Sequence, residues 1–133
     1  MFLRLLKSEQ KPLFLGLAYQ AANANGVVEE AERNLIIGLS EELGISEDNY
    51  SKLGFEQICE RLVELSSRKE LIEISFEILG IMMGDTCYDD DEKAFVRRMF
   101  EIFCLSEELM LETEECLEDY LRVFRKIERI TNS

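Results

Sequence analysis

The sequence predicts an all-α protein, a single-domain bundle of about seven helices arranged as two pseudo-symmetric halves. Three observations predict this fold class. Apolar residues recur at helical spacing along nearly the whole chain. One proline occurs in 133 residues, which suits a nearly continuous helical chain. An acidic turn in the first half has a counterpart sixty positions later (85 − 25 = 60), and the length suits one domain across residues 1–133.

The pattern predicts seven helices, and glycine and serine residues mark several of their ends. In the first half we expect helices at residues 2–9, 13–24, 29–43 and 46–65, the last broken near Gly54. In the second half we expect helices at residues 71–84 and 89–103, and a long final helix that Ser106 caps. Gly80 and Gly84 are four positions apart, which predicts close packing against a neighbouring helix.

The two halves align without gaps at the constant offset of sixty, residues 17–48 on residues 77–108. Glu32 meets Glu92 in this alignment, and Ile45-Ser46-Glu47-Asp48 meets Leu105-Ser106-Glu107-Glu108. Shared helix periodicity explains matching apolar positions, but it does not explain a loop, a cap and glutamates in register. We therefore interpret the chain as an internal duplication, with repeat halves at about 14–66 and 71–130.

Both acidic turns resemble the small-Asp-Gly-x-apolar-x-x-x-Glu signature of the tellurite-resistance TerB-like family, which DjlA-type N-terminal domains also resemble. Asp85 and Glu92 match the acids of that signature in the second half, and Glu32 matches in the first. Asn25 stands where the family has Asp, and Thr86 where it has Gly. The resemblance implies a helical fold in two similar halves, acidic residues that bind divalent cations, and a bacterial stress-response setting.

The candidate metal ligands are carboxylates of the second acidic turn. Hard cations such as calcium take several oxygen ligands, and the candidates are Asp85, Asp89, Asp91 and Glu92, with Glu32 in the first half. The turn is not an EF-hand, because Asp90 stands at its sixth position where that loop has glycine. The alternative is structural: Asp89-x-x-Glu92 forms a capping box, and first-turn acids stabilise a helix through its dipole.

The composition limits the other classes of function. The net charge of −13 repels a phosphate backbone, so nucleic-acid binding is not expected, whereas basic proteins and cations remain open as partners. Without histidine, Ser-His and Cys-His catalytic pairs are impossible, and no enzyme is expected. The four cysteines include no C-x-x-C pair, and Cys59 and Cys104 are expected to be buried thiols.

Two functions remain open. One is a TerB-like stress module that binds a divalent cation, calcium first. The other is a metal-free interaction module that docks a basic protein partner through its acidic surface. Reduced thiols and the lack of a signal-peptide pattern favour a cytoplasmic location. No stable membrane insertion is expected, because the apolar runs are short, although residues 1–9 could contact a membrane peripherally.

Overall fold

A computed structural model describes residues 1–24, 29–84 and 88–133. The described part contains six α-helices, one 3₁₀-helix and no β-strand, which confirms the predicted all-α bundle. The elements are η1 (Leu3–Leu5), α1 (Gln10–Ala22), α2 (Glu29–Leu43), α3 (Phe55–Leu65), α4 (Arg68–Gly84), α5 (Asp90–Ile102) and α6 (Glu107–Thr131).

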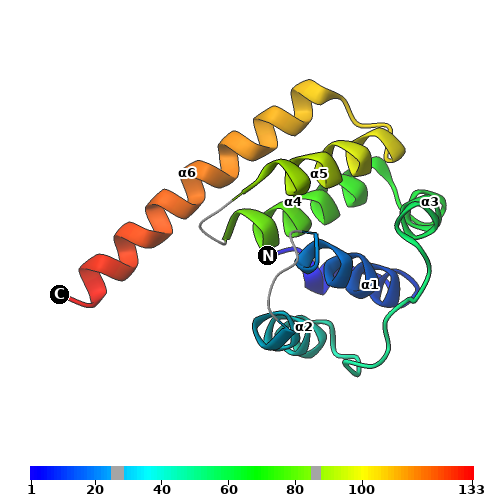
Figure 1. The fold of residues 1–133 in the computed structure, drawn as a ribbon, viewed down its shortest axis with the longest axis horizontal. Coiled ribbons are helices and arrows are strands. Elements are labelled where there is room, and N and C mark those ends of the chain that lie inside the picture. Colours follow the sequence, from blue (N-terminus) through cyan, green and yellow to red (C-terminus); the bar gives the residue numbers. More distant parts are fainter. Residues whose placement is uncertain (25–28, 85–87) are drawn as a thin grey trace.

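The helices α1 and α4 pack against each other, and the remaining helices pack around this pair (Figure 1). In the first half, α2 and α3 contact α1. In the second half, α5 and α6 contact α4. Each half therefore places its second and third helices against its first, and α3 also crosses over to contact α5.

Positions that the sequence alignment pairs are buried in both halves. Ile36 and Val96 are buried, as are Leu39 and Met99. The ends of α2 and α5 also share a backbone hydrogen bond. The N–H of Ile45 donates to the carbonyl of Ser40 at 3.1 Å, and the N–H of Leu105 donates to the carbonyl of Phe100 at 2.9 Å. Both the side-chain burial and the backbone hydrogen bonds thus follow the offset of sixty.

Two predicted helices are shorter than the sequence pattern indicated. Residues 2–9 form only the 3₁₀-helix η1, and α1 begins earlier than expected, so that Pro12 lies in its first turn. Residues 46–54 are not helical. They run across α1 instead, where the N–H of Ser51 donates to the carbonyl of Pro12 at 2.9 Å.

The glycine that allows close packing is Gly16, and the prediction for Gly80 and Gly84 was wrong. Apart from the backbone of α4 itself, a Cβ at either of those two positions would meet no described atom within 4 Å. A Cβ at Gly16 would lie 2.5 Å from the carbonyl oxygen of Ser51. The crossing of residues 46–54 over α1 therefore requires glycine at this position.

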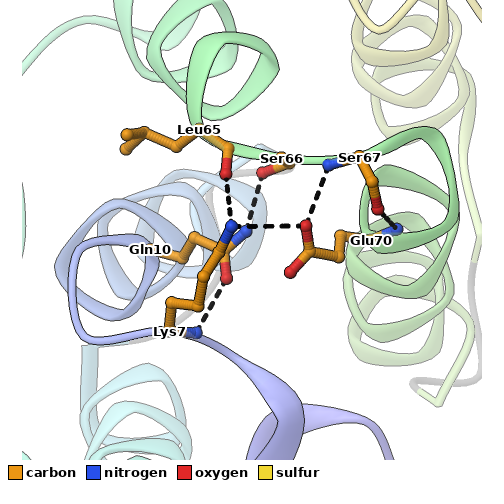
Figure 2. A network of polar contacts seen from close by, with 6 residues as sticks. All are labelled: Lys7, Gln10, Leu65, Ser66, Ser67 and Glu70. Carbon is orange, nitrogen blue, oxygen red and sulfur yellow. Dashed lines mark hydrogen bonds and ion pairs between the residues drawn. The ribbon is translucent and has the colours of Figure 1, made fainter.

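A polar network joins the N-terminal segment to the junction between α3 and α4 (Figure 2). The fully buried Gln10 accepts from the N–H of Lys7 and donates to the hydroxyl of Ser66, both at 2.8 Å. The ammonium of Lys7 donates to the carbonyl of Leu65 and lies 3.5 Å from the Glu70 carboxylate. Satisfying a buried amide in this way fixes the midpoint of the chain against the start of α1.

Candidate functional site

The second acidic turn leads into a capping box at the start of α5. Asp89 is the N-cap, and its carboxylate accepts from the N–H of Glu92 at 2.9 Å. The Glu92 carboxylate in turn accepts from the N–H of Asp89 at 3.1 Å. Both predicted ligands therefore satisfy backbone donors at the helix start, as the structural alternative expected.

Each half buries one glutamate in the first turns of its second helix. Glu92 in α5 is 3% exposed and Glu32 in α2 is 7% exposed, although glutamate is rarely buried in proteins. The side-chain amide of Asn23 donates to the Glu32 carboxylate at 2.6 Å. The sequence alignment paired these two glutamates, and the structure gives them the same burial.

The predicted metal ligands are only partly brought together. Asp89 and Glu92 contact each other, Asp91 is exposed on the same helical turn, and Glu32 lies on α2. Asp85 lies outside the described residues. Within residues 1–24, 29–84 and 88–133, no three side chains of histidine, cysteine, aspartate or glutamate are grouped to hold a metal ion. The metal site stays a prediction that depends on Asp85.

Tyr88 connects the start of α5 to the middle of α6. Its hydroxyl donates to the Glu114 carboxylate at 2.6 Å, and the Lys93 ammonium lies 5.6 Å from the centre of its ring. Burial raises the pKa of Tyr88 well above its ordinary value, and the hydrogen bond to Glu114 raises it further. The Tyr88 hydroxyl is thus engaged within the fold.

The first half of α6 presents an acidic face to solvent. Residues 107–119 contain seven acids and no Lys or Arg. Glu107 pairs with Arg97 at 2.7 Å, and Asp119 pairs with Arg122 at 2.9 Å. The remaining exposed acids form no ion pair with any described residue. They follow one side of the helix, and we call them the acidic face: Glu108, Glu112, Glu115 and Glu118.

The second half of α6 presents an apolar stripe. From residue 118 to the end of the chain every residue is exposed except the half-buried Leu121, and Figure 1 shows this part of α6 extending beyond the other helices. The large apolar side chains here are 47–58% exposed, and we call them the apolar stripe: Tyr120, Val123, Phe124, Ile127 and Ile130.

The sequence patterns did not identify the apolar stripe. Another aromatic residue, Tyr50, is half-buried and stacks on Tyr19 with 4.9 Å between ring centres. The signal that could have found the stripe is helix length, because α6 has 25 residues whereas α4, which it packs on, has 17. The two stacked tyrosines line a surface pocket of about 210 Å³ together with Arg33, Ile36, Glu47 and Asp48.

Cys104 is also placed differently from the prediction. It lies exposed after the end of α5, whereas Cys59 is buried as expected. Burial, together with the nearby Glu56 charge, raises the pKa of the Cys59 thiol to about 12, so it stays protonated at neutral pH.

No family model, curated protein or solved structure matches the chain. Among the described helices, none is both long enough and apolar enough to cross a lipid bilayer.

Proposed function

We propose that the chain is a non-enzymatic, metal-independent interaction module that docks a basic protein segment on the acidic face of α6. The observation that carries the proposal is the difference between the two acidic regions. Asp89, Glu92 and Glu32 are used in hydrogen bonds that support the helices. The acidic face, by contrast, is exposed, and no described cation neutralises it.

The spacing of the acidic face suits a helical or extended basic partner. Glu108, Glu112 and Glu115 are four and three positions apart, which places them on one side of a helix. The carboxylates from Glu108 to Glu118 span about 15 Å of helix (ten steps of about 1.5 Å) and can contact several Lys or Arg side chains of one segment. Such attraction speeds association and weakens as salt is added.

The test is titration of the chain with a synthetic lysine-rich peptide of about twenty residues, long enough to span the acidic face. The triple variant Glu108→Gln/Glu112→Gln/Glu115→Gln should weaken binding about tenfold, because three contact charges are lost. Added chelator should change nothing. A matched control, Glu41→Gln/Glu42→Gln/Glu64→Gln, removes the same net charge from exposed positions on α2 and α3. If the control weakens binding equally, attraction is non-specific and the acidic face is not the docking surface.

The second candidate function is divalent-cation binding at the second acidic turn, in a TerB-like stress-response setting. It is favoured by the burial of Glu32 and Glu92 at equivalent positions after the two acidic turns. Asp85, Asp89 and Asp91 would supply further carboxylate oxygens. The resemblance to the TerB-like family supports this candidate.

Calorimetric titration of metal-stripped protein with calcium, then magnesium and zinc, tests this candidate. Asp89→Asn is the informative variant, because asparagine caps helices as well as aspartate does but carries no charge. A cation site predicts saturable binding that both Asp85→Ala and Asp89→Asn weaken. If the acids only cap the helix, the titrations should show no heat of cation binding. The free energy of unfolding should then be unchanged in Asp89→Asn and about 1 kcal/mol lower in Asp89→Ala.

A further inference from the structure

The pocket beside the two stacked tyrosines is lined by polar groups that the fold leaves unused. It holds about 210 Å³ where α1, α2 and residues 46–54 meet, and we call it the tyrosine pocket. Its lining residues are Tyr19, Arg33, Ile36, Glu47, Asp48 and Tyr50. No described residue forms a hydrogen bond or an ion pair with either tyrosine hydroxyl, with the Arg33 guanidinium, or with the Glu47 and Asp48 carboxylates. The pocket therefore offers five polar groups to a ligand.

One wall of the tyrosine pocket is held in place by hydrogen bonds of residues 46–54. The N–H of Asn49 donates to the carbonyl of Ser46 at 2.9 Å, which closes a turn. The side-chain amide of Gln20, on α1, donates to the carbonyl of Leu53 at 3.0 Å. The two carboxylates and the ring that this segment contributes are thus positioned before a ligand arrives.

The second half of the chain has a packed core where the first half has the tyrosine pocket. At the offset of sixty, Tyr19 corresponds to Leu79, which lies on α4 and is fully buried, whereas Tyr19 is half-buried. The helix α6 begins at residue 107 and packs on α4, but the equivalent residues 46–54 are not helical. The pocket is therefore a feature of the first half alone.

The two halves also differ in how they use an equivalent glutamate. Glu47 corresponds to Glu107, which pairs with Arg97 at 2.7 Å. The counterpart of Arg97 in the first half is Ile37, so Glu47 lacks the cation that its counterpart has. A half-buried carboxylate without a partner is available to a cationic group from outside the chain.

Charges of both signs lie around the Tyr19 hydroxyl. Burial raises the pKa of Tyr19, the charges of Glu32 and Glu47 raise it further, and the Arg33 charge lowers it. Glu32 is already engaged by the amide of Asn23, and it does not line the pocket. The unpaired charges of the lining are therefore one cation and two anions.

A complementary ligand carries one anion and two cations. A guanidinium such as that of Arg33 binds a carboxylate through two parallel hydrogen bonds, and each carboxylate of the pocket can accept from an ammonium or a guanidinium. An α-amino acid with a cationic side chain combines these three charges in one molecule. A lysine or arginine side chain within a protein segment has no carboxylate for Arg33, so it matches the pocket less well.

The size and the apolar groups of the tyrosine pocket fit the same class of ligand. Pockets for drug-sized ligands hold roughly 300–1,000 Å³, so about 210 Å³ suits a single amino acid. Ile36 and the tyrosine rings provide apolar surface for its methylene groups. The Lys52 ammonium, which does not line the pocket, lies 5.6 Å from the centre of the Tyr50 ring, a position typical of attraction between a cation and an aromatic ring.

We propose that the tyrosine pocket binds a free basic amino acid, lysine or arginine, with its α-carboxylate on Arg33 and its two cationic groups on Glu47 and Asp48. This site is independent of the acidic face, which lies on α6. The variant Glu108→Gln/Glu112→Gln/Glu115→Gln should therefore leave amino-acid binding unchanged, and either proposal can fail without the other.

Calorimetric titration of the full chain with L-arginine and L-lysine, at a constant ionic strength of about 150 mM, tests the proposal. Saturable binding of one molecule per chain is expected, with a dissociation constant below about 1 mM. Two analogues show which charges are used. Agmatine lacks the carboxylate of arginine, and norleucine lacks the side-chain cation of lysine. Each should bind at least about tenfold more weakly than its parent amino acid.

The variants assign the charges to residues. Arg33→Gln should weaken arginine binding about tenfold but should not weaken agmatine binding, because Arg33 contacts only the carboxylate. Glu47→Gln should weaken the binding of both. Arg129→Gln is the matched control, since it removes the same charge as Arg33→Gln from an exposed position on α6 and should change neither.

Three results would overturn the proposal: no saturable binding up to about 10 mM amino acid, agmatine binding as tight as that of arginine, or an equal loss of binding in Arg129→Gln and Arg33→Gln. The second result would show that the pocket accepts a cation without reading the carboxylate. The third would show that the attraction is non-specific. Circular dichroism confirms that each variant is folded.

Discussion

Gly44 and Cys104 stand sixty positions apart, and both adopt the left-handed backbone conformation, with φ of +72° at Gly44 and +56° at Cys104. Each residue directly follows the final turn of a helix, and the next N–H donates back to that helix. Among the described residues, Cys104 is the one non-glycine residue with positive φ. The two halves therefore share this turn, but only the first half has the residue that adopts it without strain.

Cys104→Gly should stabilise the protein by about 1 kcal/mol, because glycine relieves the strain of a left-handed conformation at this position. Urea denaturation measures the free energy of unfolding. Cys116→Gly is the control, since Cys116 lies exposed inside α6, where glycine should destabilise by about 1 kcal/mol. A loss of stability in Cys104→Gly would show that the cysteine side chain contributes more than the strain removes.

Gly16→Ala should destabilise the protein by about 1–3 kcal/mol, because its Cβ would press against the carbonyl of Ser51 and force residues 46–54 away from α1. Gly80→Ala provides the comparison within another helix. Apart from the backbone of α4, no atom of the described residues lies within 4 Å of its added Cβ, so alanine should stabilise α4 by up to about 1 kcal/mol. Thermal unfolding distinguishes the two, and equal effects would contradict the close crossing over α1.

Glu70 should make stability depend on pH in the acid range. The N–H of Ser67 donates to its carboxylate at 2.8 Å, and this bond, with the Lys7 charge, holds the pKa of Glu70 below its ordinary value of 4.5. A lowered pKa stabilises the fold above pH 4.5, and this contribution is lost as pH falls through the folded-state value.

Comparison of Glu70→Gln with the parent chain checks this pH dependence. The difference in melting temperature should be largest near neutral pH and should shrink below about pH 4.5. Glu64→Gln serves as the control, because Glu64 is exposed at the end of α3. A difference between Glu70→Gln and the parent that stays constant down to about pH 3 would contradict the assignment.

Tyr88→Phe should lower the free energy of unfolding by about 1–2 kcal/mol, because it removes the hydroxyl that donates to Glu114. Tyr120→Phe removes a hydroxyl from the exposed stripe and should change stability little. If the two variants are equally stable, Tyr88 does not hold α5 against α6.

Local signals predicted most helix boundaries. The bounds of α2 agree with the prediction, and Asp89 and Ser106 cap the helices that the sequence assigned to them. These features depend on neighbouring residues alone. The segment at 46–54 was predicted wrongly because its path is set by contacts with Pro12 and Gly16, far away in the sequence.

At the candidate sites, too, features set by neighbouring residues could be predicted, and features set by distant contacts could not. The Asp89–Glu92 capping box could be predicted, since the motif spans four consecutive residues. The burial of Glu32 and Glu92 and the exposure of the apolar stripe could not, because both depend on where the surrounding helices begin and end.

The continuity of α6 has a consequence for anything bound to its second half. Residues 120–131 continue the same helix that Met110 and Leu117 fix against the bundle, so the stripe lies at a set rotation and reaches about 18 Å beyond residue 119. Inserting one residue at that boundary would turn the stripe by about 100° and advance it by about 1.5 Å. The length of α6 therefore sets both how far the stripe stands from the bundle and the direction that it faces.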